Sequence, residues 1–438
     1  MKKETKFKQT EIGKIPEDWD VRKIGDISKF QYGLGESAKP VGDFIYIRIT
    51  DIDNNGFLNK NGLVFVGKEK VKENCILKKG DVLVARTGAT YGKTYLFKEN
   101  FHATYGGFLI KFLLDKKYID NYFFFQFSRS RTYWYQANNL VSGGAQPQFN
   151  ANTISELMIP LPPIYEQELI AKILSDLDSK IELNHRMNKT LEAIGQAIFK
   201  RWFIDFEFPN EEGKPYKSSG GEMVYNEELE EEIPRGWEGG KLSDVVEITS
   251  SKRIFLSEYQ KEGVPFFRSK EIIELYSGKD ISLELYISPA RYEEVKKKYG
   301  VPRNRDILLT SVGTIGIPYL VKENDYFYFK DGNLTWFRNY QKNMNGQFIY
   351  YWLQSKCTKQ QIKAITIGST QQALTINGLN NLNIVIPTEN ILKSFLNIIN
   401  KLIDKKEINT QEISLLQQIR DSLLPKLMSG KIRVKVTG

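Results

Sequence analysis

Residues 165–203, YEQELIAKILSDLDSKIELNHRMNKTLEAIGQAIFKRWF, carry a long helical pattern that contains no proline. Apolar residues recur every three or four positions in it, at Ile170, Ile173, Leu177, Met187, Leu191, Ile194 and Ile198. This spacing places them on one stripe of a helix, which at ~1.5 Å per residue would be ~50 Å long. Too little sequence surrounds the pattern to bury such a helix on every side. We therefore expect it to pack against a second long helix.

The second helix is expected near the end of the chain, in ILKSFLNIINKLIDKKEINTQEISLLQQIRDSLLPKLM, residues 391–428, and it behaves like the first as far as Pro425. Residues seven positions apart are predicted to pack between the helices, and the spacing of Asn184, Leu191 and Ile198 recurs 225 positions later. The full set is Ile170, Leu177, Asn184, Leu191, Ile198, Asn409, Leu416 and Leu423. In an antiparallel pair with a pseudo-twofold axis, mid-helix residues meet their own counterparts. Asn184 and Asn409 would then fix the register near the axis, as a buried Asn can in a coiled coil. The alternative is that both asparagines are solvated surface residues.

Each helical pattern ends one copy of a repeat that spans half the chain. IPEDW at 15–19 recurs as IPRGW at 233–237. YIRITDI at 46–52 has a counterpart in FFRSKEI at 266–272, which places Arg48 opposite Arg268. The repeat unit is too long for a solenoid and indicates two related domains instead.

Two loops are also repeated. GDVLVARTGATYGKTYLF at 80–97 aligns with RDILLTSVGTIGIPYLV at 305–321, which sets Gly88 opposite Gly313. SGGAQPQFNANTI at 142–154 aligns with IGSTQQALTINGL at 367–379, which pairs Gln146 with Gln371. The glycines persist while the neighbouring side chains change, a pattern that suits loops positioning side chains for recognition.

Each copy begins with short Val, Ile, Phe and Tyr runs broken by Gly, Asn and Asp, which predict strands. We predict an α/β (α+β) fold of two pseudo-symmetric globular domains joined by two long antiparallel helices that form a coiled-coil-like spacer. The predicted boundaries are a first globular domain at 1–160, the first long helix at 161–206, a Gly/Ser/Pro/Glu-rich linker at 207–232, a second globular domain at 233–388, and the second long helix with a C-terminal tail at 389–438.

ARTGATYGKTYLF at 85–97 resembles a phosphate-binding loop. Gly92, Lys93 and Thr94 fit the end of G-x-x-x-x-G-K-[ST], but Thr87 stands where the first glycine should be. The second copy has Ile317 and Pro318 after its glycine turn and no lysine. We therefore interpret the segment as a glycine turn between two strands.

Composition restricts the class of protein. Hydrophobic residues make up 41% of 438 residues, ample for packed cores and unlike a disordered chain. No apolar run reaches the ~18 residues of a membrane span, and the basic start MKKETKFKQTEIGK lacks the apolar core of a signal peptide. Cys75 and Cys357 stand far apart, which argues against a disulfide framework and fits a reducing cytoplasm. The formal net charge of +9 is compatible with a polyanionic partner.

Catalytic patterns are missing from the sequence. His102 and His185 are the only histidines, and neither forms a Cys/His or metal-ligand spacing. LPPIY at 161–165 is similar to the [ND]-P-P-[YF] motif of adenine-N6 methyltransferases, but Leu161 replaces the residue that would accept from the adenine amino group. The segment is better interpreted as a proline-marked helix start. We expect a protein without catalytic residues or a metal site.

The combination of these features resembles the specificity subunit of type I restriction–modification systems over nearly the whole chain. The resemblance is carried by IPEDW, IPRGW, ARTGATYGK, the ending LLPKLMSGKIRV, and LPPIYEQELIAKILSDLDSKIELNHRMNKTLEAIGQAIFKRWFIDFE. It implies a noncatalytic scaffold whose two target recognition domains each read one half of a bipartite site in double-stranded DNA. The helices would set the spacing between the half-sites.

The resemblance also implies partners. The helices would dock two modification subunits that carry the methyl donor and the adenine-N6 chemistry. Restriction subunits, which are ATP-driven translocases and nucleases, would join for cleavage. No cofactor is expected on this chain, since the methyl donor and ATP belong to the partner subunits, and no membrane is involved.

DNA contacts are predicted from residue type and loop position. Arg and Gln can bind guanine and adenine edges, and Lys and Arg can neutralise phosphates. The candidates are Arg48, Arg86, Thr87, Tyr91, Lys93, Gln146 and Gln148 in the first domain, and Arg268, Lys270, Thr314, Gln371 and Gln372 in the second. Each could contact a base or the backbone, and Arg48 could instead hold the end of a strand. The glycines expected to shape the loops are Gly88, Gly92, Gly143, Gly144 and Gly313.

Two other functions stay open on the sequence. One is a stand-alone sequence-specific DNA-binding protein without enzyme partners, which co-purification with a methyltransferase would distinguish. The other is a phosphate-loop enzyme, whose nucleotide binding would depend on Lys93. The second copy of the repeat, which lacks this lysine, argues against the enzyme.

Overall fold

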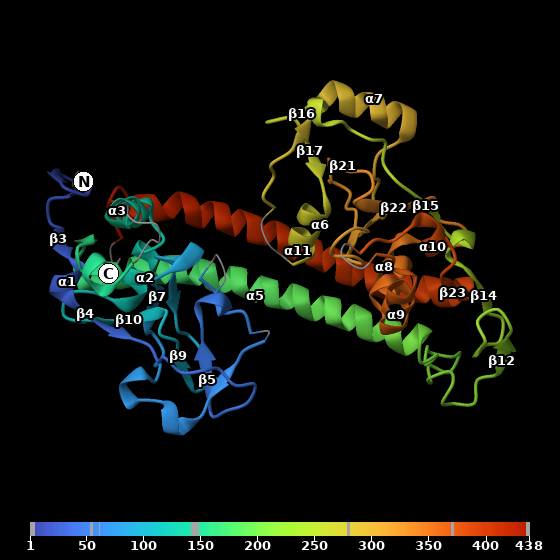
Figure 1. Cartoon of the computed structure of the whole chain (residues 1–438), viewed down its shortest axis with the longest axis horizontal. Helices are drawn as coiled ribbons and strands as arrows, with labels where there is room; N and C mark the ends of the chain where they lie inside the picture. The colour runs from blue at the N-terminus through green and yellow to red at the C-terminus, as the bar shows by residue number, and fades with distance from the viewer. Residues whose placement is uncertain are drawn as a thin grey trace. The chain divides into compact units, whose positions relative to one another are not determined.

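The computed structural model describes residues 5–52, 56–60, 62–141, 149–277, 281–368 and 372–434. The chain divides into two compact units: unit 1 is Met1–Leu183 with Glu412–Gly438, and unit 2 is Asn184–Gln411. The long helices α5 (Ile164–Phe203) and α11 (Glu389–Met428), green and red in Figure 1, each contribute one half to each unit. The predicted boundaries followed the sequence repeat, whereas this division follows the contacts that each half-helix makes.

Unit 1 is built on a four-stranded antiparallel sheet in the order β4-β10-β7-β8, beside a three-stranded sheet β6-β5-β9 in which β5 and β9 are parallel. Two-stranded sheets β1-β2 and β11-β3 complete it. Its strands are β1 (Phe7–Thr10), β2 (Gly13–Pro16), β3 (Asp20–Lys23), β4 (Ser28–Tyr32), β5 (Phe44–Ile47), β6 (Phe65–Val66), β7 (Val82–Ala85), β8 (Thr94–Leu96), β9 (Ala103–Tyr105), β10 (Leu109–Leu114) and β11 (Met158–Leu161). Its shorter helices are α1 (Ile24–Ile27), α2 (Asn121–Phe127), α3 (Arg131–Val141) and α4 (Ala151–Ser155).

Unit 2 repeats this topology. Its four-stranded sheet β15-β22-β19-β20 corresponds to the sheet of unit 1, and β16-β18-β17-β21 includes the parallel pair β17 and β21. Its strands are β12 (Met223–Asn226), β13 (Glu231–Pro234), β14 (Glu238–Lys241), β15 (Glu247–Thr249), β16 (Tyr259–Gln260), β17 (Val264–Phe267), β18 (Tyr286–Ile287), β19 (Ile307–Thr310), β20 (Pro318–Leu320), β21 (Tyr328–Phe329), β22 (Leu334–Arg338) and β23 (Asn383–Ile386). Its shorter helices are α6 (Ser269–Tyr276), α7 (Pro289–Tyr299), α8 (Gly346–Gln354), α9 (Lys356–Ile365) and α10 (Ile376–Asn380).

Helix caps repeat with the topology. Asp120 caps α2 by accepting from the backbone N of Phe123 at 2.8 Å, and Asn345 caps α8 by accepting from Phe348 at 2.9 Å. Such caps satisfy backbone donors that a helix start leaves open. The aromatic residues after each cap then enter the core of their own unit: Phe123 and Phe124 in unit 1, Phe348 in unit 2.

The long helices pair in antiparallel fashion within each unit. In unit 1 Asp178 of α5 binds Arg420 of α11, and Lys180 binds Glu412. In unit 2 the Nδ2 of Asn409 donates to the Oδ1 of Asn188 at 2.9 Å. Residue numbers therefore rise along α5 as they fall along α11, as the prediction of an antiparallel pair requires.

The buried face of α5 differs from the predicted apolar stripe. Ile173 and Ile194 are 36% and 41% exposed, whereas Leu174, Asp178 and Asn184 are buried. The prediction counted only apolar residues, but the buried face also carries polar side chains that find partners there. Among the residues predicted to pack, the buried ones are Ile170, Asn184 and Asn409, and the half-buried ones are Leu177, Leu191, Ile198, Leu416 and Leu423.

Two further expectations change. Asn184 and Asn409 are each 1% exposed, so the alternative of solvated asparagines is wrong. Pro425 does not end α11, which continues to Met428. A proline removes one helical hydrogen bond, and the burial of Leu424 and Leu427 in the core of unit 1 offsets that loss.

The segment predicted as a linker, 207–232, is ordered. It contains β12, which pairs with β13, and Phe208, whose ring stacks on Trp237 at 5.0 Å between centroids. Trp237 is the tryptophan of the IPRGW motif. The chain that follows α5 therefore packs on the first residues of the second copy, where Phe208 covers the ring of Trp237.

In unit 1, the tail after α11 packs on the tryptophan of the first copy. Trp19, of IPEDW, donates its Nε1 to the Oε2 of Glu166 at 3.2 Å. The Nε of Arg433 donates to the Oε1 of Glu166 at 2.8 Å, and its guanidinium lies 5.7 Å from the centre of the Trp19 ring. A buried carboxylate and an arginine thus fasten the C-terminal tail to the start of the chain.

Candidate nucleic-acid interface

The segment that resembles a phosphate-binding loop is a hairpin connection. β7 and β8 are antiparallel neighbours, and only a short 3₁₀ turn (Gly88–Thr90) lies between them. A phosphate-binding loop leads instead into the N-terminus of a helix. Gly88 and Gly92 have φ of 74° and 75°, and Gly313 in the equivalent turn of unit 2 has φ of 77°. This left-handed conformation favours glycine.

Arg86 lies at the end of β7, where this hairpin turn begins. Its guanidinium carbon is 5.4 Å from the ring centre of Tyr32 and 5.9 Å from that of Phe108. Among the described residues, its buried Nε has no hydrogen-bond partner. Both neighbouring rings are exposed, at 41% for Tyr32 and 58% for Phe108. The guanidinium of half-buried Arg86 therefore lies beside two aromatic rings that reach the surface.

The backbone of Arg86 also contacts Phe149. Its backbone oxygen accepts from the backbone N of Phe149 at 2.8 Å. The residues just before Phe149 include four predicted site residues that lie outside the described residues: Gly143, Gly144, Gln146 and Gln148.

The remaining candidates of the hairpin differ in their surroundings. Tyr91 donates its hydroxyl to the Oδ1 of Asn138 at 2.7 Å and packs against the rings of Trp134 and Phe149. Lys93 lines a small pocket together with Trp134. Thr87 is half-buried ahead of the 3₁₀ turn.

Arg48 and Arg268 occupy equivalent positions in the repeat, and each forms an ion pair with the acid three residues later. The Nη2 of Arg48 donates to the Oδ1 of Asp51 at 2.8 Å, and the Nη2 of Arg268 donates to the Oε1 of Glu271 at 2.6 Å. The backbone N of each arginine also donates to the same carboxylate. Both acids are buried. Each arginine therefore holds the turn after a strand, β5 or β17, which is one of the two roles considered for Arg48.

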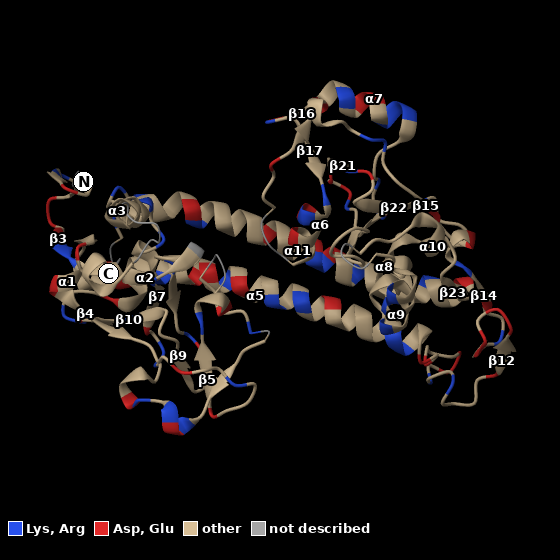
Figure 2. Cartoon of the chain, viewed as in Figure 1, with Lys and Arg blue, Asp and Glu red and all other residues tan. Residues whose placement is uncertain are grey.

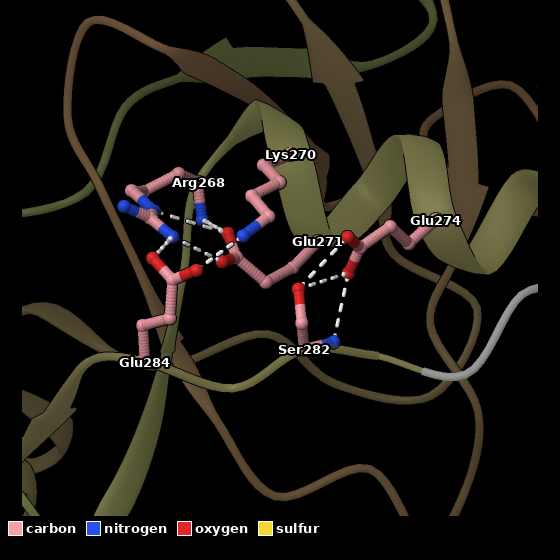
Figure 3. A network of polar contacts seen from close by, with 6 residues as sticks. All are labelled: Arg268, Lys270, Glu271, Glu274, Ser282 and Glu284. Atoms are coloured by element: carbon pink, nitrogen blue, oxygen red, sulfur yellow. Dashed lines mark hydrogen bonds and ion pairs between the residues drawn. The ribbon is translucent and has the colours of Figure 1, made fainter. Parts of the chain in front are cut away.

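Lys270 shares a second carboxylate with Arg268. Glu284 accepts from the Nη2 of Arg268 at 3.0 Å and from the Nζ of Lys270, and Figure 3 shows both cations directed at it. Lys270 and then Arg268 hold the pKa of Glu284 below its ordinary value. A DNA phosphate that contacts either cation would have to compete with Glu284.

The recognition loops of unit 2 bring two further candidates to the surface. Thr314 and Gln372 are exposed, and the backbone N of Gly313 donates to the backbone O of Gln372 at 3.0 Å. The structure thus places the glycine turn beside the glutamine loop, as their shared position in the repeat suggests. Gln371 lies outside the described residues.

Positive charge is not confined to these loops. Figure 2 shows Lys and Arg along both long helices and on α7, interspersed with Asp and Glu. On α7 the basic residues follow one another at Lys296, Lys297 and Lys298. Because both signs alternate over most of the surface, specific loop residues carry more information about a ligand than net charge does.

The comparisons with known proteins agree with this organisation. The family model for the type I restriction modification DNA specificity domain matches residues 16–193 and again 234–418. The chain belongs to this family. The two matches fall on the two copies of the repeat, so the chain is a specificity subunit with two recognition domains.

Relatives of full length support the assignment. The MjaIX specificity subunit of a type I restriction enzyme from Methanocaldococcus jannaschii is 31% identical over 444 residues, which cover 99% of this chain and 98% of the relative. The HindI specificity subunit from Haemophilus influenzae is 25% identical over 480 residues, with 95% and 100% covered. The S subunit structure from M. genitalium shares the fold, with a TM-score of 0.56 at 17% identity over 93% of this chain and 96% of that one.

Specificity subunits are noncatalytic components of type I restriction–modification systems, and this chain is one of them. Within the described ranges no group of three or more His, Cys, Asp and Glu side chains could hold a metal ion. In the same part of the chain, no helix has both the length and the apolar character needed to cross a bilayer.

Sequence reasoning did not single out Tyr32 and Phe108, the two rings beside Arg86. A single aromatic residue at the edge of a strand is usually a core residue. The one available signal was the pair Gly106 and Gly107 directly before Phe108, which indicates a sharp change of chain direction there.

Proposed function

We propose that this specificity subunit reads a bipartite sequence in double-stranded DNA, one half-site with each recognition domain. Arg86 carries the proposal, because its guanidinium lies beside two exposed aromatic rings and pairs with no carboxylate among the described residues. Such a group is suited to hydrogen bonding with a guanine edge. Further candidates of the first domain, Thr87, Lys93, Gln146 and Gln148, would complete the first reading surface. Thr314, Gln371 and Gln372 would do so in the second domain.

The repeat supports two different half-sites. The backbone N of Arg86 donates to the O of Phe108 at 3.0 Å, and the backbone N of Ser311 donates to the O of Asn333 at 2.9 Å in unit 2. The backbone frame is thus the same, while the side chains at equivalent positions differ in charge and size. Two copies of one frame with different side chains would read an asymmetric site.

The long helices would dock the enzymatic partners. Leu415 and Ile419 of α11 are 57% and 38% exposed although the same helix buries another face. Exposed apolar residues on a helix are suited to a partner helix. We propose two modification subunits with adenine-N6 methyltransferase activity and, for cleavage, restriction subunits.

The proposed complex also implies where the cofactors bind and in which compartment the protein acts. The methyl donor and ATP would bind to the partner subunits, and this chain would bind neither. Chromosomal DNA is the substrate, so the complex would act in the cytoplasm.

Sequencing of N6-methyladenine in host DNA tests the function. With the partner genes in place, we expect a bipartite methylated motif that disappears when this gene is deleted and returns with the wild-type gene. An unchanged methylome, with the modification subunit shown to be present and active, would contradict the proposal.

Arg86→Ala tests the residue that carries it. We expect the complex with modification subunits to lose about 10-fold or more in affinity for the target, corresponding to the 1–3 kcal/mol of a bidentate base contact, with nonspecific affinity unchanged. Arg22, which lies 4.3 Å from the ring of Tyr118, is a matched control outside the hairpin loops. An equal loss on all sequences would make Arg86 a phosphate contact.

A further inference from the structure

Phe108 is an exposed aromatic residue placed beside the guanidinium of Arg86. It directly precedes β10, and 58% of its surface is accessible. An exposed Phe side chain contributes little to folding through burial. The backbone at Phe108 is tied to Arg86, since the carbonyl of Phe108 accepts from the backbone N of Arg86 at 3.0 Å.

Tyr32 is the second ring beside Arg86. Its hydroxyl accepts from the backbone N of Ala151 at 3.3 Å, so the ring is tied to the start of α4. Arg86 therefore lies against two rings, 5.4 and 5.9 Å from their centres, and both rings reach the surface. Contacts with aromatic faces orient a guanidinium without using its hydrogen-bond donors.

The second domain does not repeat this arrangement. Ser311 takes the place of Arg86 and is buried, with its Oγ 2.6 Å from the Oγ1 of Thr335. Asn333 takes the place of Phe108. Packing of the shared frame thus requires neither an arginine nor an aromatic ring here, which separates the pair Arg86 and Phe108 from the structural part of the repeat.

The chemistry of the pair matches one kind of ligand. A guanidinium can bind O6 and N7 of guanine in the major groove, and an exposed Phe can contact the 5-methyl group of thymine. We propose that Arg86 and Phe108 read one base-pair step of the first half-site, a guanine with a thymine next to it, and that Phe108 is a specificity-determining residue. This inference rests on the proposed function and names the base chemistry that one domain recognises.

Base analogues test the pair without altering the protein. Using the target defined by the methylome, binding of the wild-type complex would be measured on duplexes with uracil in place of each thymine of the first half-site, which removes only the methyl group. We expect one uracil substitution next to a guanine to weaken binding about 5- to 10-fold. Replacing that guanine with 7-deazaguanine, which lacks N7, should weaken it similarly.

Phe108→Ala then identifies the residue. The affinity of the variant for the thymine duplex should fall by the same 5- to 10-fold. The variant should then bind the thymine and uracil duplexes equally, with its nonspecific affinity unchanged. Phe7→Ala, at an exposed phenylalanine of β1, is the matched control and should keep the discrimination. Because Phe108 is exposed, the thermal midpoint should not change, and Phe108→Leu should keep part of the preference.

The outcomes separate the two proposals. If the wild-type complex prefers no sequence, the proposed function fails. If it prefers a bipartite site but tolerates uracil at every position of the first half-site, or if Phe108→Ala still discriminates against uracil, the reading role of Phe108 is overturned and the function stands.

Discussion

Asp178 and Arg420 are 242 residues apart in the sequence and meet in unit 1, where the Nη1 of Arg420 donates to the Oδ1 of Asp178 at 3.1 Å. Asp178 also accepts from Arg129 at 2.6 Å and from Gln126 at 3.0 Å. The aspartate is 1% exposed. One carboxylate thus connects both long helices to the globular part of the first domain.

Asp178→Ala should destabilise unit 1 by about 3–5 kcal/mol, because removal of one partner leaves buried charges unpaired. Urea unfolding followed by tryptophan fluorescence measures the change. Asp176→Ala on the same helix is the control: its exposed carboxylate pairs with the exposed Lys172, and the substitution should have almost no effect. A similar loss in both variants would mean that the network contributes nothing beyond a surface charge.

The stability of unit 1 should fall in acid partly through Asp178. Burial raises its pKa, but Arg129, Gln126 and Arg420 outweigh burial and hold the pKa below its ordinary value. A group with a lowered folded-state pKa stabilises fully above its unfolded value of about 3.9 and loses that contribution as pH falls through the folded value. Asp178→Asn should therefore flatten the dependence of unfolding free energy on pH below about 4. An unchanged slope would assign the acid sensitivity to other carboxylates.

Gly195→Ala should destabilise unit 2 although alanine usually stabilises a helix interior by about 1 kcal/mol relative to glycine. Gly195 is the counterpart, 225 positions earlier, of Arg420. A Cβ there would lie 2.6 Å from Cζ of the buried Tyr351, and overpacking of this kind costs about 1–3 kcal/mol. Thermal unfolding measures the sum of the two effects.

Tyr351→Leu provides the matched background for that measurement. With the ring removed, Gly195→Ala should become neutral or stabilising, as helix propensity alone predicts. If Gly195→Ala destabilises equally in both backgrounds, the contact with Tyr351 is not the cause.

Arg433→Ala should loosen the C-terminal tail from the first domain. Glu166 is 1% exposed and accepts from both Nε and Nη2 of Arg433, so the substitution leaves a buried carboxylate with Trp19 and a weak backbone donor. We expect a loss of about 2–4 kcal/mol and faster amide exchange around Trp19. Lys426→Ala, at an exposed lysine in the last turn of α11, should change neither the stability nor the amide exchange. Protection of the Trp19 region that survives Arg433→Ala would show that packing alone holds the tail.

Much of the architecture was predictable from sequence because it depends on local periodicity. A 3.6-residue period needs only the backbone geometry of a helix, so both long helices were expected within a few residues of α5 and α11. The glycines of the hairpin turns were equally readable, since Gly88 and Gly313 stand where the chain takes a positive φ. The repeat itself, and with it the pairing of equivalent positions, required nothing more than the order of the residues.

Which partner neutralises each charged residue could be seen only in the folded structure. Arg48 and Arg86 look alike as candidates in the sequence, yet Arg48 is bound to Asp51 while Arg86 lies beside two rings. The buried face of α5 shifted to include Asp178 for the same reason: its partners come from other parts of the chain. Periodicity is a property of neighbours along the chain, whereas the neutralisation of a charge depends on neighbours in space, and tertiary packing alone sets those.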